Sequence, residues 1–133
     1  MIHGIGVDIL RISRMERLLD RWGARFVNRV FTGAEVETCR TRARPAAAYA
    51  LRFAAKEALS KALGLGLTGG VRWRDMEVYH QPGGRPALRV HGRCAEICGQ
   101  RGIRSMHLSL SDEGDYGVAM VILEADDEAG DGV

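Results

Sequence analysis

The stretch PAAAYALRFAAKEALSKALG, residues 45–64, predicts one long helix that organises the rest of the fold. Pro45 suits the first helical turn, where its missing backbone N–H costs nothing. We expect the helix to continue through Leu63, and Gly64 begins a glycine-rich loop that ends it. The main apolar face of this helix consists of Leu51, Ala55, Ala58, Leu59 and Ala62.

Glu57 and Lys61 are one turn apart on this helix, about 40° from each other around its axis and away from the main apolar face. One interpretation is a solvent-facing ion pair worth a few tenths of a kcal/mol. The other is a functional site, because two carboxylates from separate elements can hold a magnesium ion when substrate phosphates and waters complete the octahedron. A nearby lysine then suits a phosphate.

The opening segment contains a second carboxylate, that of Asp8. Its residues 2–9, IHGIGVDI, mostly alternate between larger apolar side chains and glycine or polar ones, which predicts a β-strand. Ile5, Val7 and Ile9 share one face of this strand. The other face carries Gly4, Gly6 and Asp8. The missing side chains would let another group approach the backbone beside the Asp8 carboxylate. The alternative is an ordinary core strand that contains glycine, and both interpretations remain open on the sequence.

The remaining segments predict shorter elements. Two capping-box patterns open helices, Ser13 with Glu16 and Thr32 with Glu35, and the first helix has Met15, Leu18, Leu19 and Trp22 on its apolar side. A hairpin around residues 81–84, a helix at 93–100 and strands at 106–111 and 116–124 follow. In the strand at 106–111, the inward residues are Met106, Leu108 and Leu110, and the outward ones are His107, Ser109 and Ser111. We therefore predict a single α+β domain over residues 1–124, an antiparallel sheet packed on one long helix, with a frayed acidic tail at 125–133.

Composition and charge narrow the class of protein. The 133 residues are 46% hydrophobic and 27% charged, which is typical of a globular domain and excludes disordered and fibrous classes. The chain shows no signal-peptide pattern and no apolar run of membrane-spanning length, and its three cysteines fit no zinc or disulfide framework, so we expect a cytoplasmic protein. Residues 11–52 hold ten arginines against four acids, a surplus that could attract an acidic partner.

Several segments resemble one enzyme family. They are GIGVDI at residues 4–9, RFAAKEALSKALG at 52–64, WRDMEV at 73–78, GRPAL at 84–88 and HLSLS at 107–111. In order and spacing they are similar to holo-(acyl-carrier-protein) synthase, the small bacterial type of 4′-phosphopantetheinyl transferase. Members of this family transfer the 4′-phosphopantetheine arm of coenzyme A to a serine of apo acyl carrier protein and release adenosine 3′,5′-bisphosphate.

The resemblance implies a role for each matching residue. Asp8 and Glu57 would bind Mg²⁺ and, with Lys61, form the catalytic group. The coenzyme A site would be lined by Arg52, Lys61, Gly64, His107 and Ser109. Arg14 and Arg21 would receive the acidic carrier protein. The family also implies a homotrimer with active sites between subunits. The acceptor of the serine proton stays open between Glu57 and a metal-bound water.

One position departs from the family pattern, because Asp112 stands where a histidine usually follows the Ser-x-Ser/Thr strand. An acid beside bound phosphates would be unfavourable unless it faces away or joins the metal shell. An alternative function is therefore a family member that binds coenzyme A but has a lost or altered transferase activity. A nucleic-acid-binding module is the remaining alternative, and the low aromatic content of 6% with no matching motif argues against it.

Overall fold

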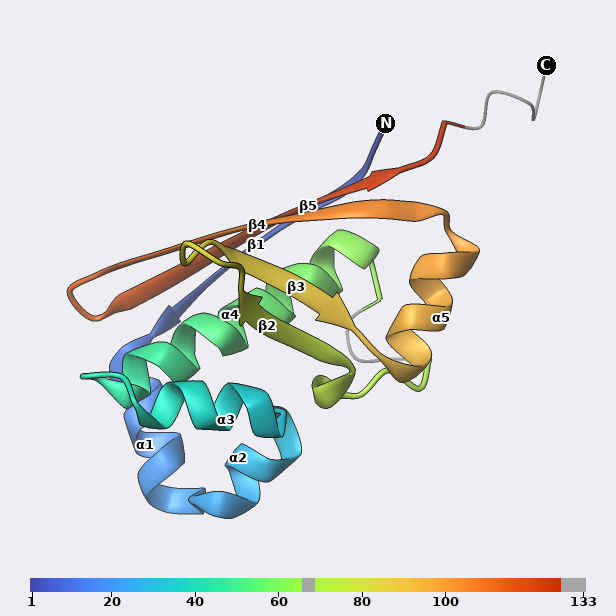
Figure 1. The fold of residues 1–133 in the computed structure, drawn as a ribbon. Coiled ribbons are helices and arrows are strands. Elements are labelled where there is room, and N and C mark those ends of the chain that lie inside the picture. The colour runs from blue at the N-terminus through green and yellow to red at the C-terminus, as the bar shows by residue number, and fades with distance from the viewer. Residues whose placement is uncertain (66–68, 128–133) are drawn as a thin grey trace.

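A computed structural model describes residues 1–65 and 69–127 of the chain. Its elements follow the order β1 (Ile2–Arg11), α1 (Ile12–Trp22), α2 (Ala24–Val30), α3 (Gly33–Arg40), α4 (Pro45–Leu63), the 3₁₀ turn η1 (Trp73–Asp75), β2 (Met76–His80), β3 (Pro86–Val90), α5 (Gly92–Gln100), β4 (Ile103–Glu113) and β5 (Tyr116–Ala125). Figure 1 shows the start of β1 and the end of β5 at the same end of the molecule, where the Met1 amino group donates to the Ala125 carbonyl at 3.2 Å. The acidic tail that we expected beyond β5 lies mostly outside the described residues.

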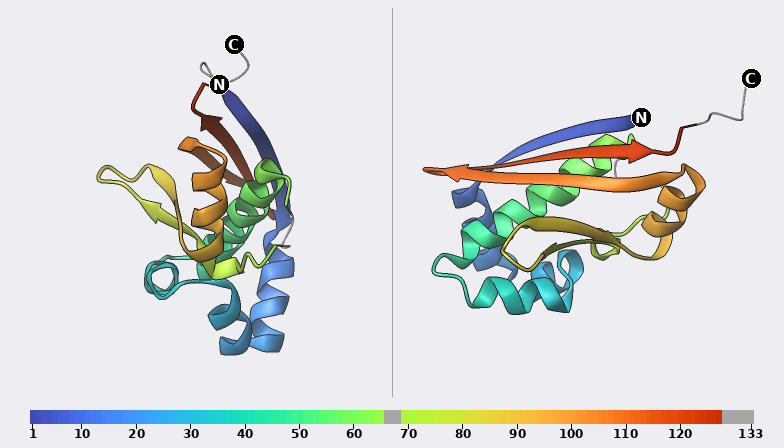
Figure 2. Two further views of the ribbon diagram at one scale, coloured as in Figure 1. Left: turned by 90° about the vertical axis from the view of Figure 1, so that its right-hand side faces the viewer. Right: turned by 45° about the horizontal axis from the view of Figure 1, so that its top comes forward.

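The strands form two antiparallel sheets. Three strands pair in the order β1-β5-β4, and β2 pairs with β3 as a hairpin of its own. Figures 1 and 2 show α4 lying against one face of the three-stranded sheet. The α+β class, the antiparallel pairing and the long helix are thus confirmed, and the hairpin forms a second sheet.

The close contact between β1 and α4 explains the glycines of the first strand. A Cβ atom added at Gly6 would lie 1.8 Å from the Ala58 carbonyl oxygen, and one added at Gly4 would lie 2.0 Å from that of Ala62. The group that approaches the glycine face is therefore the backbone of α4. This contact brings Asp8, on the same face of β1, beside the last turns of α4.

Helix α4 is largely buried because its residues pack in two hydrophobic clusters. One joins its second half to β5, β2, β3 and α5 through residues such as Ala58, Val121 and Val78. The other joins its first half to α1, α2 and α3 through residues such as Ala50, Met15 and Phe31. The inward positions Met106, Leu108 and Leu110 of β4 pack against the first cluster, as the alternation predicts.

The helix starts agree with the sequence in two cases and differ in one. Pro45 lies in the first turn of α4, and Thr32 and Glu35 form the predicted capping box of α3. The box predicted at Ser13 and Glu16 is wrong: α1 begins at Ile12, its N-cap Arg11 makes no side-chain cap, and Ser13 bonds elsewhere. Of the helices in the described ranges, none has the length and apolarity to cross a bilayer.

Candidate functional site

The contact between β1 and α4 joins three of the residues singled out in the sequence. The Lys61 ammonium donates to the Asp8 carboxylate at 3.1 Å and to the Val7 carbonyl at 3.1 Å. The Asp8 side chain is 17% exposed and that of Lys61 is 55% exposed. Because β1 is an edge strand, this cluster opens to solvent along one side of the sheet.

Glu57 lies one turn before Lys61 and shares the electrostatic environment of Asp8. Partial burial raises the pKa of the Glu57 carboxyl, and the negative charge of Asp8 raises it further. The positive charges of Lys61 and Arg14 act in the opposite direction. The two carboxylates therefore repel each other, and a bound cation between them would relieve that repulsion.

The donor set at this cluster fits a magnesium ion that also contacts a substrate. Magnesium takes oxygen ligands in an octahedron, keeps several waters, and is usually held by one or two carboxylates plus phosphate oxygens. Asp8 and Glu57 supply two carboxylates from separate elements. Within residues 1–65 and 69–127, no group of three His, Cys, Asp or Glu side chains forms a closed metal cage, so the remaining ligands would come from substrate and water.

Arg52 lies apart from this cluster, because five residues rotate it about 140° around the helix from Glu57. Its side chain is buried, and only its Nη1 is hydrogen-bonded within the described ranges, to the Ala48 carbonyl at 3.1 Å. Arg52 lines a hollow of about 220 Å³ together with Arg42, Arg44, His80 and Asp112. Burial and the charges of Arg52 and Arg42 lower the pKa of His80. The lining of this hollow therefore contains more cationic than anionic side chains.

The departure at Asp112 therefore lies within a cationic environment. Asp112 lies two residues after Leu110 on the inner face of the three-stranded sheet. It lines the hollow together with three arginines, Arg42, Arg44 and Arg52. The three arginines give the walls of the hollow a surplus of positive side chains over the one acid, Asp112.

His107 and Ser109 lie on the opposite face of the sheet from Asp8. Both are exposed on β4, and His107 bonds the Glu124 carboxylate at 2.6 Å. Gly64 is the left-handed C-cap of α4 at φ 72° and is exposed. Within one chain, the structure thus brings Asp8, Glu57 and Lys61 together, but it leaves Arg52, His107 and Ser109 in separate places.

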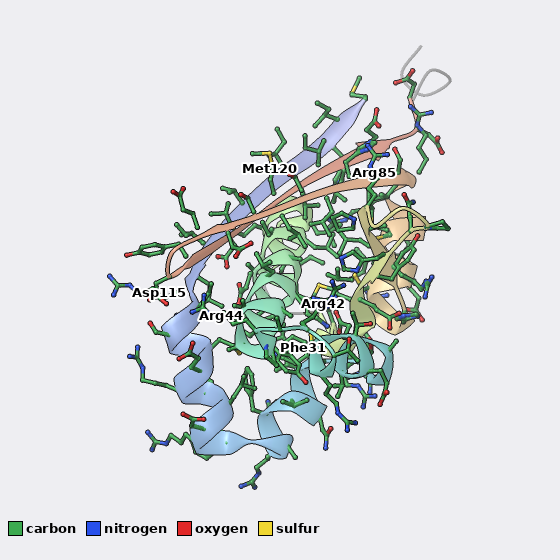
Figure 3. The ribbon with its side chains drawn as sticks, turned by 60° about the vertical axis from the view of Figure 1, so that its left-hand side comes forward. Phe31, Arg42, Arg44, Arg85, Asp115 and Met120 are labelled. Carbon is green, nitrogen blue, oxygen red and sulfur yellow. The ribbon has the colours of Figure 1, made fainter. Side chains whose placement is uncertain are left out.

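The outer face of this sheet is unusually apolar for an exposed surface. Ile5, Val7, Ile9 and Met120 are 58%, 51%, 63% and 44% exposed. The strand register aligns Val7 with Met120 and Met120 with Ser109, so the apolar rows of β1 and β5 run directly into the polar row of β4. Met120 is labelled on this face in Figure 3.

Arg14, Arg17 and Arg21 follow one another at spacings of three and four residues and form an exposed basic stripe on α1. Beside it, Leu18 and Trp22 of α1 and Arg25, Phe26 and Arg29 of α2 line a groove of about 480 Å³. Trp22 is 47% exposed rather than buried, so it is not a core residue. Helix α2 and therefore this groove were not predicted from the sequence, although Arg25 and Arg29 continue the four-residue spacing from Arg21.

Lys56, next to Glu57, has a structural role that was not predicted from the sequence. Its ammonium is fully buried, pairs with the Glu35 carboxylate at 2.7 Å and donates to the Val30 and Met76 carbonyls at 2.9 and 2.6 Å. Burial lowers the pKa of Lys56, and the charge of Glu35 opposes that effect. Lys56 therefore ties α2, α3 and β2 to α4, directly behind the site.

Comparison with known proteins identifies the family to which the sequence and the fold are similar. The sequence model of the 4′-phosphopantetheinyl transferase superfamily matches residues 4–121. A holo-[acyl-carrier-protein] synthase of Koribacter versatilis is 46% identical over 124 residues, which cover 93% of this chain and 99% of that protein. The structure of holo-[acyl-carrier-protein] synthase from Neisseria meningitidis superposes with a TM-score of 0.87 at 36% identity, covering 93% of this chain and 99% of that one. The Bacillus anthracis synthase, solved in complex with CoA (3′,5′-ADP), gives a TM-score of 0.78 at 35% identity and covers 95% and 99%.

Proposed function

This chain belongs to the 4′-phosphopantetheinyl transferase superfamily, in the group of holo-[acyl-carrier-protein] synthases, and we propose that Asp8, Glu57 and Lys61 form its catalytic centre. The enzyme transfers the 4′-phosphopantetheine arm of coenzyme A to a serine of apo acyl carrier protein. Residues 1–124 are its catalytic domain, and it acts in the cytoplasm. The observation that carries the proposal is the meeting of Asp8 with Lys61 at 3.1 Å, beside a Glu57 whose pKa is raised.

The reaction requires a serine hydroxyl to attack a pyrophosphate phosphorus while adenosine 3′,5′-bisphosphate leaves. Such a displacement depends on positioning and charge neutralisation more than on covalent help from the protein. Asp8 and Glu57 would hold Mg²⁺, which when bound neutralises the pyrophosphate charge and orients it. Lys61 is exposed enough to turn its ammonium from Asp8 to the departing phosphate.

Glu57 is the candidate acceptor of the serine proton. In the metal-free chain, partial burial and the charge of Asp8 raise the pKa of Glu57, which favours proton uptake. Binding of Mg²⁺ to both carboxylates would oppose this effect, and a metal-bound water is then the alternative acceptor. Arg14 is close enough for its charge to act on the same carboxylate. A carrier protein bound on α1 would therefore present its serine next to Glu57.

Because Arg52 lies about 140° around α4 from Glu57 within one chain, coenzyme A would extend from this centre to the Arg52 hollow of a neighbouring subunit. The buried Nε and Nη2 of Arg52 are without a hydrogen-bond partner in the described part of the chain, and leaving such groups unpaired is costly. Phosphate oxygens would satisfy them, and a guanidinium binds phosphate well. His107, Ser109 and Gly64 would provide further contacts to the coenzyme.

We further propose that the active enzyme is a homotrimer whose sites lie between subunits. Asp8 faces α4, whereas His107 and Ser109 lie on the outer face of the sheet, so one coenzyme molecule cannot reach all of them within a single chain. The exposed apolar row of Ile5, Val7, Ile9 and Met120 would be covered by a neighbouring copy. The edge position of β1 then lets a neighbour approach the Asp8 cluster.

The carrier protein would dock on α1 and α2. Arg25 and Arg29 line a groove together with Trp22 and Phe26, and Arg14 and Arg21 are exposed on the adjoining helix α1. Acyl carrier proteins are acidic, so opposite charges would speed the encounter and set its orientation, and the aromatic groove would anchor a side chain.

Intact-mass measurement tests the proposed reaction directly. An apo acyl carrier protein, incubated with coenzyme A, Mg²⁺ and this enzyme, should gain the mass of one phosphopantetheine arm. A carrier protein in which the acceptor serine is replaced by alanine should gain nothing. Binding of coenzyme A without any mass gain would favour the alternative, a coenzyme-binding relative without transferase activity.

A further inference from the structure

The first turn of α1 is held by a residue from the far end of the chain. The Asp115 carboxylate accepts hydrogen bonds from the Ser13 backbone N–H at 2.9 Å and from the Ser13 hydroxyl at 2.6 Å. The Asp115 carbonyl also accepts from the Ile12 backbone N–H at 2.7 Å. Figure 3 shows Asp115 at the turn between β4 and β5, beside the start of α1.

Helix α1 depends on this contact because it has no cap of its own. The first backbone N–H groups of any helix need partners from outside the helix. The N-cap Arg11 supplies no side-chain bond, and the first turn contains no acid. Helix α3, by contrast, carries its own capping box. Asp115 thus provides both the hydrogen bonds and the negative charge that an α1 N-terminus requires.

The carboxylate of Asp115 is held in its charged form by its surroundings. The bonds from Ser13 lower its pKa, and the charges of Arg11 and Arg44 act in the same direction. Arg44 in turn pairs with Glu16 of α1 at 3.4 Å, and Arg11 stacks over the Tyr116 ring at 5.4 Å. Arg44, labelled near Asp115 in Figure 3, also lines the Arg52 hollow. The turn is therefore connected to α1 and to the proposed coenzyme site.

We propose that Asp115 is a positioning residue for the transfer reaction, which fixes α1 so that Arg14 and the bound carrier protein lie correctly over Glu57. The inference rests on the proposed function, because it takes α1 as the docking helix. Asp115 itself touches neither substrate. It joins the docking helix to β4, the strand that carries Ser109 and Asp112. Loss of its bonds would loosen the placement of one substrate while leaving the carboxylate pair intact.

Steady-state kinetics of Asp115→Ala test this proposal. We expect the KM for the carrier protein to rise about fivefold, the factor that corresponds to loss of one helix cap, while the KM for coenzyme A stays unchanged. Asp115→Asn keeps one acceptor for the Ser13 N–H and should give a smaller increase. Glu113→Ala is the matched control, because this exposed acid lies in the same hairpin and makes no hydrogen bond to α1 in the described structure.

Hydrogen exchange of the Ser13 amide, which donates to the Asp115 carboxylate, gives a readout in the free enzyme that does not depend on docking. It should accelerate in Asp115→Ala and stay unchanged in Glu113→Ala. Unchanged exchange, or an equal rise of both KM values, would overturn the positioning role. Faster exchange with an unchanged KM for the carrier protein would also overturn it. The double variant Arg14→Glu with Arg21→Glu distinguishes the two proposals. If it leaves the KM for the carrier protein unchanged, the proposal that α1 is the docking helix fails. If it raises this KM while Asp115→Ala does not, only the role of Asp115 is refuted.

Discussion

Two carboxylates and one ammonium give the site its proposed chemistry at the scale of single residues. Replacing Glu57 by glutamine keeps the shape of the side chain but removes its charge and its ability to accept a proton. We predict that Glu57→Gln lowers kcat/KM for transfer at least about 100-fold, the usual range for a lost general base. The melting temperature should not fall, because the variant loses the repulsion from Asp8. Initial rates and thermal melting of one preparation check both parts.

Glu96→Gln is the control for this prediction, since Glu96 is an exposed acid on α5 that pairs with the exposed Arg93. It should transfer at the wild-type rate. A fully active Glu57→Gln enzyme would remove Glu57 from both the metal site and the proton transfer.

The two lysines of α4 are five residues apart and should behave in opposite ways. Lys56→Ala would leave Glu35 buried without its partner, so we expect a loss of about 3–5 kcal/mol in the free energy of unfolding. Lys61→Ala breaks an exposed pair and should cost under about 1 kcal/mol of stability while it slows transfer strongly. Urea unfolding with parallel rate measurements separates the two. If Lys56→Ala and Lys61→Ala lost the same free energy of unfolding, the assignment of a structural role to Lys56 and a functional role to Lys61 would be wrong.

The sequence identified some of these residues and missed others for physical reasons. Spacing indicated that Glu57 and Lys61 share a helix face, and alternation placed Asp8 with the glycines; their proposed roles came from the resemblance. The burial of Lys56 could not be predicted, because its partner Glu35 comes from another helix, 21 residues earlier. Periodicity describes one element and carries no information about which distant acid will meet it.

The contact of β1 with α4 is the decisive feature at the scale of elements. Gly6→Ala would place a Cβ atom 1.8 Å from the Ala58 carbonyl oxygen, so backbone must move. We predict a loss of about 3 kcal/mol in unfolding free energy, as for overpacked cores, and a lower transfer rate because Asp8 shifts away from Glu57. Chemical denaturation checks the first effect. Gly99→Ala on α5 is the control: a Cβ there meets nothing within 4 Å, so stability should hold or rise slightly. Equal stability of Gly6→Ala and wild type would contradict the close contact.

Elements with local signals were predicted well, and those that depend on distant partners were not. Pro45 and the Thr32–Glu35 box located the starts of α4 and α3. The box at Ser13 failed because Asp115, 102 residues away, takes the hydrogen bonds of Ser13. Alternation showed the hairpin of β2 and β3 but not that it forms a separate sheet, since pairing beyond the hairpin leaves no local pattern.

The whole molecule presents an apolar sheet face that a homotrimer would cover. We predict that light scattering at micromolar concentration gives the mass of three 14.6 kDa chains. Ile5→Glu with Met120→Glu should shift the enzyme to monomers, because charges at both exposed positions cannot be buried cheaply. Trp22→Glu is a matched control at similar exposure on another surface and should remain trimeric. A wild-type protein that is monomeric under these conditions would refute the assembly.

The central claim is that one site takes Asp8, Glu57 and Lys61 from one subunit and Arg52 from the next. Co-expression of two inactive variants, Glu57→Gln and Arg52→Met, tests it most directly; methionine fills the volume of the buried arginine without an unpaired charge. Random mixing in a cyclic trimer leaves about a quarter of the sites with both intact halves, so the mixed enzyme should recover up to that fraction of wild-type transfer. A mixed trimer as inactive as its parents would contradict the shared site and place the complete reaction within one chain.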